Sequence, residues 1–163
     1  MNPWKRRLLV LARLVLGAFL IFAGIVHLGA QRAEFQAQVP SWIPIAEDTV
    51  VVVSGIVEIT LGAALVLARR RSPIVGVIVA AFFIAIFPGN IAQFVEGKSA
   101  FGLDSDTQRF VRLWFQPVLV VWALLSLKDG RLGNAAFWAL LGLSFLIGSH
   151  VSDLVNGVLV LAM

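Results

Sequence analysis

The chain contains no cysteine, and this absence removes several kinds of chemistry. Without a thiol among its 163 residues, the protein forms no disulfide and performs no thiol exchange. It also lacks the thiolates that usually hold iron–sulfur clusters and that attach c-type haem. Any redox role would therefore depend on a bound cofactor or on a partner protein.

Charged residues are scarce as well. They make up 13% of the chain, whereas hydrophobic residues make up 60%, and the mean hydropathy is +0.93. Soluble domains are about one quarter charged, and the apolar residues here form runs too long for the helices of a soluble core. The composition predicts an all-α membrane protein with one transmembrane domain over residues 1–163 and no separate globular part.

Four apolar runs have the length of about 20 residues that a membrane-spanning helix needs. They predict helices at Leu8–Leu28, Thr49–Ala68, Ile74–Val95 and Phe110–Leu127. The first run is longer than the apolar part of a signal peptide, and Leu28 disrupts a cleavage site at Ala30, so we expect a retained anchor. A further segment, 134–162, is interrupted by His150 and Asp153. It predicts an extra C-terminal helix, either tilted and spanning or shorter with an interfacial tail.

Basic residues gather at the ends of these runs, which indicates membrane topology and not nucleic-acid binding, despite a net charge of +4. The clusters predicted on one side are Lys5, Arg6, Arg7, Arg69, Arg70, Arg71, Lys128 and Arg131. Because such clusters are retained in the cytoplasm, we expect a multi-pass protein of the cell membrane with a cytoplasmic N-terminus. A fifth span would place the C-terminus outside the cell.

Two loops are predicted on the extracytoplasmic side, and they differ in chemistry. Gly29–Asp48 contains an expected interfacial helix at Gln31–Val39. An extended turn with a tryptophan at headgroup depth follows, formed by Pro40, Trp42 and Pro44. Glu96–Arg109 is polar and contains glycine, which is typical of a mobile loop.

Polar residues inside the predicted spans are costly to insert, so each needs a partner or a water-lined cavity. Five of them share the outer half of the expected bundle: His27, Glu58, Asn90, Arg112 and Gln116. Pro88 and Pro117 free helix carbonyl groups at similar depth. We predict that Arg112 pairs with Glu58, while the two amides supply hydrogen bonds. Together the five residues would form one ligand pocket.

Small residues share helix faces with these polar groups. One stripe on the first helix consists of Arg13, Gly17, Leu20, Gly24 and His27. A matching stripe on the second helix consists of Gly55, Glu58 and Gly62. Glycines in such positions allow two helices to approach closely. Arg13, a secondary polar site nearer the cytoplasm, is expected to snorkel or to contact lipid phosphate.

Two interpretations of the polar cluster remain open, because a Glu–Arg pair with amide neighbours can stabilise a bundle without any ligand. His150 and Asp153, the other secondary polar residues, share a helical face that would join the pocket, bind a cation or meet the headgroups. The histidines and carboxylates lack the spacing of metal ligands. Haem ligation between His27 and His150 is equally disfavoured, so we expect no metal and no catalytic residue.

Several short motifs, taken in order, resemble the DoxX-like family of small integral membrane proteins. They are Arg13-Leu-Val-Leu-Gly17-Ala-Phe19, Ala23-Gly24-Ile-Val-His27, Val39-Pro40-Ser-Trp42-Ile-Pro44, Ser54-Gly55-Ile-Val-Glu58-Ile-Thr-Leu-Gly62, Phe87-Pro88-Gly89-Asn90 and Arg112-Leu-Trp-Phe-Gln116. The resemblance covers about residues 8–127 and implies a four-helix transmembrane bundle there. The namesake resembles a subunit of a thiosulfate:quinone oxidoreductase, and other relatives act in redox-linked complexes or as membrane chaperones.

The resemblance and the expected pocket together favour an accessory subunit of a membrane redox or envelope complex that is not an enzyme on its own. Its pocket would bind a quinone-like amphipathic molecule, with donors from Asn90, Arg112 and Gln116. One alternative is a scaffold or assembly factor for a membrane or extracytoplasmic partner, or for a second copy of the chain. Proton-coupled transport is a further alternative. It is weaker because the chain shows no inverted halves of the kind on which alternating access depends.

Overall fold

The structure is a computed structural model that describes residues 2–67 and 73–125. Its helices are α1 (Pro3–Leu28), α2 (Arg32–Gln36), α3 (Glu47–Leu67), α4 (Pro73–Val95), α5 (Asp106–Leu113) and α6 (Phe115–Leu125). These described ranges contain no strand, so the predicted all-α class is confirmed. Three helices are long and apolar enough to cross a membrane, namely α1, α3 and α4. The expected C-terminal helix at 134–162, with His150 and Asp153, lies outside the described residues.

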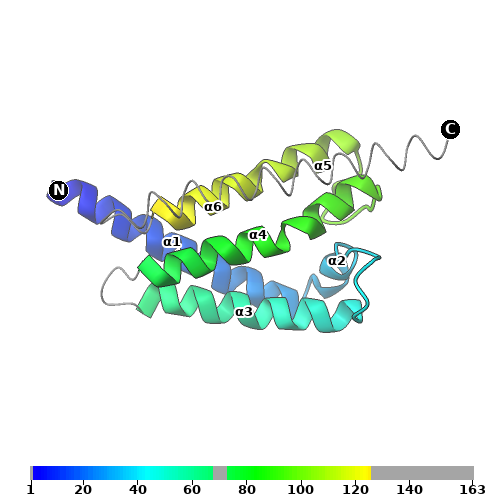
Figure 1. Cartoon of the computed structure of the whole chain (residues 1–163), viewed down its shortest axis with the longest axis horizontal. Coiled ribbons are helices and arrows are strands. Elements are labelled where there is room, and N and C mark those ends of the chain that lie inside the picture. Colours follow the sequence, from blue (N-terminus) through cyan, green and yellow to red (C-terminus); the bar gives the residue numbers. More distant parts are fainter. Residues whose placement is uncertain (1, 68–72, 126–163) are drawn as a thin grey trace.

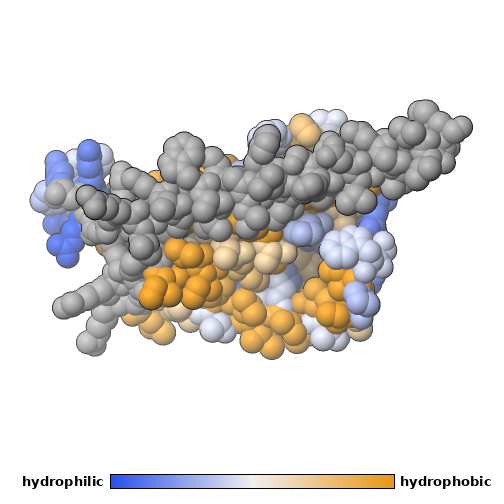
Figure 2. All heavy atoms as spheres, in the orientation of Figure 1, coloured by the Kyte–Doolittle hydropathy of each residue, from blue (hydrophilic) through white to orange (hydrophobic). Residues whose placement is uncertain are grey.

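The helices run back and forth along one long axis (Figure 1). α1 lies against α3, and α4 contacts both α3 and α6. Figure 1 shows α2 and the connection from α4 to α5 at the end opposite the N-terminus, which we call the loop end. Figure 2 shows hydrophobic side chains across the middle of the visible face and hydrophilic ones gathered at both ends. This banding is what a bilayer requires of a protein that spans it.

α1 and α3 meet through their glycines. A Cβ atom on Gly24 would lie 2.5 Å from the carbonyl oxygen of Gly55, and one on Gly62 would lie 2.6 Å from that of Gly17. The two pairs are reciprocal, because the helices are antiparallel and each glycine faces the backbone of the other helix. The close contact expected from the two stripes is therefore present. It is possible because glycine has no side chain to hold the two backbones apart.

Apolar side chains fill the middle of the bundle. The buried cluster draws on four helices and consists of Leu16, Leu20, Leu65, Val79, Ala80, Phe83, Ile84, Val120, Ala123 and Leu124. A hydrogen bond from Trp122 Nε1 to the carbonyl oxygen of Ala12, 3.0 Å long, joins α6 to α1 beside it. This core holds the helices in the arrangement that brings the polar residues of the loop end together.

The fourth expected span, Phe110–Leu127, is divided into α5 and α6 at Trp114. Pro117 has no N–H group, so the carbonyl of Leu113 loses its helical partner. The Trp114 N–H donates instead to the carbonyl oxygen of Val111, 3.1 Å away, which is a tighter turn. The predicted helix is therefore divided at Trp114, and its last two residues, 126–127, lie outside the described residues.

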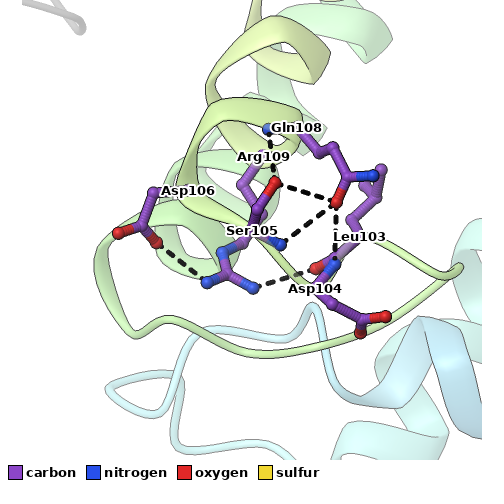
Figure 3. Close-up of polar contacts among 6 residues, drawn as sticks. All are labelled: Leu103, Asp104, Ser105, Asp106, Gln108 and Arg109. Atoms are coloured by element: carbon purple, nitrogen blue, oxygen red, sulfur yellow. Dashed lines mark hydrogen bonds and ion pairs between the residues drawn. The ribbon is translucent and has the colours of Figure 1, made fainter.

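α5 also begins four residues earlier than expected, at Asp106. Ser105 and Gln108 form a capping box, in which the side-chain oxygen of each residue accepts a hydrogen bond from the backbone N–H of the other (Figure 3). Arg109, which we expected to end the loop, is buried and donates to the Leu103 carbonyl oxygen at 2.9 Å and to Asp106 at 2.8 Å. These contacts set the direction in which α5 enters the bundle.

Candidate ligand-binding site

A cavity of about 750 Å³ lies toward the loop end, between α1, α3, α4 and the α5–α6 junction. All five residues of the predicted pocket line it: His27, Glu58, Asn90, Arg112 and Gln116. Of the outer-loop residues, Pro40 and Trp42 line the cavity as well, whereas Pro44 does not. Most of the remaining wall is aliphatic or aromatic, so the polar groups lie on a largely apolar surface, as is typical of small-molecule sites.

His27 and Glu58 are the most buried charged or titratable pair of the cavity, at 8% and 4% exposure. His27 Nδ1 lies 2.8 Å from the carbonyl oxygen of Ala23 and 2.9 Å from Glu58 Oε2. Because a carbonyl oxygen only accepts, Nδ1 carries the hydrogen. That hydrogen points toward Ala23, so Glu58 Oε2 lies close to the imidazole without an aligned hydrogen bond among the described residues.

The predicted ion pair between Glu58 and Arg112 is wrong, since the partner of Glu58 is His27. The reason lies in the contact of α1 with α3. Side chains on a helix lean toward its N-terminus. Because α1 and α3 are antiparallel, the His27 side chain leans away from the loop end and the Glu58 side chain leans toward it, so the two meet. The Gly24–Gly55 contact places the two backbones close enough for this, with His27 Cβ only 3.0 Å from the position of a Cβ on Gly55.

The two amides form their own unit on α4 and α6. Asn90 Nδ2 donates to Gln116 Oε1 at 2.9 Å. Gln116 Nε2 in turn donates to the carbonyl oxygen of Phe83, and the Gln116 side chain is buried. Pro88 leaves the carbonyl of the next residue, Ile84, without its helical partner. The amide of Gln116 therefore bonds to the Phe83 carbonyl and not to the carbonyl that the proline frees.

Arg112 contacts an aromatic ring and no carboxylate. Its guanidinium carbon lies 4.7 Å from the centroid of the Phe101 ring, within the range of a cation–π interaction. Among residues 2–67 and 73–125, no acidic side chain pairs with it. Arg112 therefore brings a positive charge to the cavity wall that the described part of the chain does not neutralise.

Two aromatic residues that the sequence did not mark complete the loop-end wall. Phe35 on α2 stacks on His27 with ring centroids 3.4 Å apart, and it meets Phe101 edge-on at 4.7 Å. Phe101 has a positive φ of 57° and is followed by Gly102 at 67°. A φ above zero is unusual for a bulky residue and is found at sites whose surroundings enforce it. Here the Phe101 N–H donates to Glu34 Oε2 at 2.6 Å.

Further contacts join the two loops beside this wall. Gln38 donates to Gln93 at 2.7 Å, and the Lys98 ammonium group donates to the Val39 carbonyl oxygen at 3.3 Å. Glu96 accepts from the Ser41 hydroxyl at 3.1 Å and pairs with Lys98 at 2.8 Å. Burial alone would raise the pKa of Glu96, but Lys98 and Ser41 outweigh it and hold that pKa below its usual value.

A short ion pair secures α2 at the loop end. Arg32 Nε and Nη2 donate to the two carboxylate oxygens of Asp48, each at 2.6 Å. Both side chains are exposed, and the Asp48 hydrogen bond raises the pKa of Arg32 further above its usual value. The expected interfacial helix is present but shorter than Gln31–Val39, with turns at both sides of Arg32–Gln36.

Of the secondary polar residues, the structure describes only Arg13, which does not line the cavity. Arg13 lies in the half of α1 nearer the N-terminus, is half-buried, and its Nε has no hydrogen-bond partner. His150 and Asp153 lie outside the described residues. Within the part of the chain that the structure describes, no three metal-ligating side chains gather.

A family model described as a domain of unknown function, DUF8561, matches residues 16–126. A second model, described as a protein of unknown function, DUF979, matches residues 113–163. No curated protein matches the chain. No solved structure matches it either.

Proposed function

The chain belongs to the DUF8561 family, and we propose that it is an accessory subunit of a membrane redox or envelope complex that binds an amphipathic, quinone-like molecule. The observation that carries the proposal is the loop-end cavity, where five polar residues from separate helices line one apolar enclosure. Polar groups this deep in a bundle are costly unless they serve a partner. The motif resemblance to DoxX-like proteins supports the accessory role.

In this proposal the ligand places its polar group near the α5–α6 junction. Within residues 2–67 and 73–125, the guanidinium of Arg112 contacts the Phe101 ring, and its N–H groups can donate to ligand oxygens. The His27–Glu58 pair lies on the α1–α3 side of the same cavity and would face the ligand there. Aliphatic residues such as Val50, Val57 and Ile86 would surround the apolar part. Such a site binds a ligand without needing chemistry of its own.

The proposal includes a topology. The N-terminus with Lys5 would face the cytoplasm, α5 and α6 would together form a fourth span, and 134–162 would form a fifth. The loop end would then lie outside the cell, because basic residues favour the cytoplasmic side.

The absence of native cysteine makes this topology easy to test. We expect a membrane-impermeant maleimide to label an Asp104→Cys variant in intact cells, because Asp104 is exposed at the loop end. Lys5→Cys should be labelled only after permeabilisation. The opposite pattern would reverse the orientation and remove the extracytoplasmic site.

Filling the cavity tests the binding function. Val57 lines the cavity, whereas its neighbour Ile56 is exposed on the outside of α3. We expect decylubiquinone to raise the Tm of the purified wild-type protein and of Ile56→Phe, and to leave Val57→Phe unchanged because the new ring occupies the site. Native mass spectrometry of protein purified in mild detergent should show a co-purified molecule that Val57→Phe lacks. Absence of any stabilising or co-purifying amphiphile would refute the proposal.

One observation favours a scaffold as a second candidate. Trp42 lines the cavity yet is 68% exposed at the loop end, and exposed aromatic residues are common anchors for partner proteins. A scaffold would retain its partner in Val57→Phe and lose it in Trp42→Ala. The two functions therefore differ in which of these variants is defective.

A further inference from the structure

The cavity wall carries a positive charge without a described counter-ion. Arg112 is half-buried, and its contact within the described residues is with the face of Phe101. A cation–π contact neutralises no charge, and it is weaker than a pair with a carboxylate. A guanidinium in apolar surroundings therefore lacks the stabilisation that an anionic partner would give it.

Glu58 does not supply that counter-ion. It is almost completely buried and already lies 2.9 Å from the His27 imidazole. The other polar side chains that line the cavity are neutral, namely Gln31, Gln38, Thr49, Ser54, Asn90 and Gln116. Asn90 and Gln116 bond to each other, and Gln116 also bonds to α4.

Arg112 also occupies a particular place. A second cavity of about 550 Å³ adjoins the first on the side of α5 and α6, and its wall is more apolar than that of the first. The residues that line both are Phe19, Asn90, Phe101, Arg112, Gln116 and Leu119. The guanidinium thus lies on the wall between two apolar spaces, where a head group could reach it while a chain extends away.

We propose that the ligand is a single-chain amphiphile with an anionic head, a carboxylate or a phosphate, and that Arg112 is its counter-charge. This inference rests on the proposed function and narrows it. The guanidinium fork matches both head groups in a bidentate manner. The volume of about 750 Å³ falls within the range of about 300–1,000 Å³ typical of small-molecule sites. The apolar chain would lie along α3 and α4, where Val50, Val53, Val57, Phe82 and Ile86 line the wall.

Four ligands of similar chain length test the inference: dodecanoate, dodecyl phosphate, dodecanol and decylubiquinone. Each would be titrated into the full-length protein in a nonionic detergent, and bound ligand counted by native mass spectrometry. We expect the two anions to bind about 10- to 100-fold more tightly than the alcohol. This is the difference in affinity expected when one charge-assisted hydrogen bond is present in the anion complexes and missing in the alcohol complex. The tighter of the two anions identifies the head group.

Variants separate the charge of Arg112 from its shape. Arg112→Gln should weaken the anions by a similar factor and leave dodecanol unchanged. Arg112→Lys, which keeps the charge but not the fork, should recover part of the affinity. Lys5→Gln removes the same charge at the opposite end of the bundle and should leave all four affinities unchanged. Circular dichroism of each variant checks that the helices remain.

The outcomes distinguish the inference from the function on which it rests. If dodecanol or decylubiquinone binds as tightly as dodecanoate, and Arg112→Gln leaves the anions unaffected, the anionic head is refuted while a ligand site remains. If none of the four ligands binds, the proposed function itself is refuted.

Discussion

Leucine at Gly24 is expected to lower the free energy of unfolding by about 3 kcal/mol or more, the upper part of the range for overpacked cores. Even a Cβ atom at this position would lie 2.5 Å from the Gly55 carbonyl oxygen. Because that atom belongs to the backbone, no side-chain movement relieves the clash, and α1 and α3 must separate. Separation would also move His27 away from Glu58.

The measurement is a thermal or SDS unfolding curve of the purified protein, followed by circular dichroism. Ala18→Leu is the matched control, because Ala18 lies on the exposed side of the same helix. Gly62→Leu should behave like Gly24→Leu, since its Cβ would lie 2.6 Å from the Gly17 carbonyl oxygen. Equal unfolding of Gly24→Leu and Ala18→Leu would show that the glycines do not form the contact.

The second large effect concerns the buried pair. We expect Glu58→Ala to destabilise the protein by about 1–3 kcal/mol, because it removes a buried carboxyl group that lies 2.9 Å from the His27 imidazole. His27 Nδ1 would then keep only the Ala23 carbonyl as a partner, and the space of the carboxylate would join the cavity. Protein abundance in the membrane should fall accordingly.

A double-mutant cycle identifies the true partner of Glu58. His27→Phe combined with Glu58→Ala should cost less than the sum of the two single changes, because the second change removes a group that the first has already left unpaired. Arg112→Ala combined with Glu58→Ala should be additive. Coupling between Glu58 and Arg112 without coupling to His27 would contradict the arrangement in the structure.

The long helices were predictable because their signal is local. An apolar run of sufficient length reports a span by itself, and α1, α3 and α4 end within a few residues of the expected positions. The glycine stripes were equally visible, because a helical period of about 3.6 residues fixes which side chains share a face. The division of α5 from α6 was half visible, since Pro117 indicated a lost hydrogen bond but not whether the helix would bend or break.

The cavity wall was only partly predictable. Depth alone grouped the five polar residues, since a charged or amide side chain inside a span can be placed by counting from the membrane boundary. Depth does not say which helices are neighbours. From their opposite charges, the sequence therefore predicts a pair between Arg112 and Glu58. In the structure, the close contact of the glycines places Glu58 beside His27 instead.

By itself, the sequence determined that this protein is helical, that it has the composition of a membrane protein, and which polar residues lie at one depth, because these properties depend on hydropathy and helical period along one chain. Only the tertiary structure decided the pairing of His27 with Glu58, the contact of Arg112 with Phe101, and the contribution of Phe35 and Phe101 to the cavity wall. Those features depend on which helix faces meet and on how two loops fold over them. Contacts between distant residues of this kind arise from packing, which no local pattern of residues encodes.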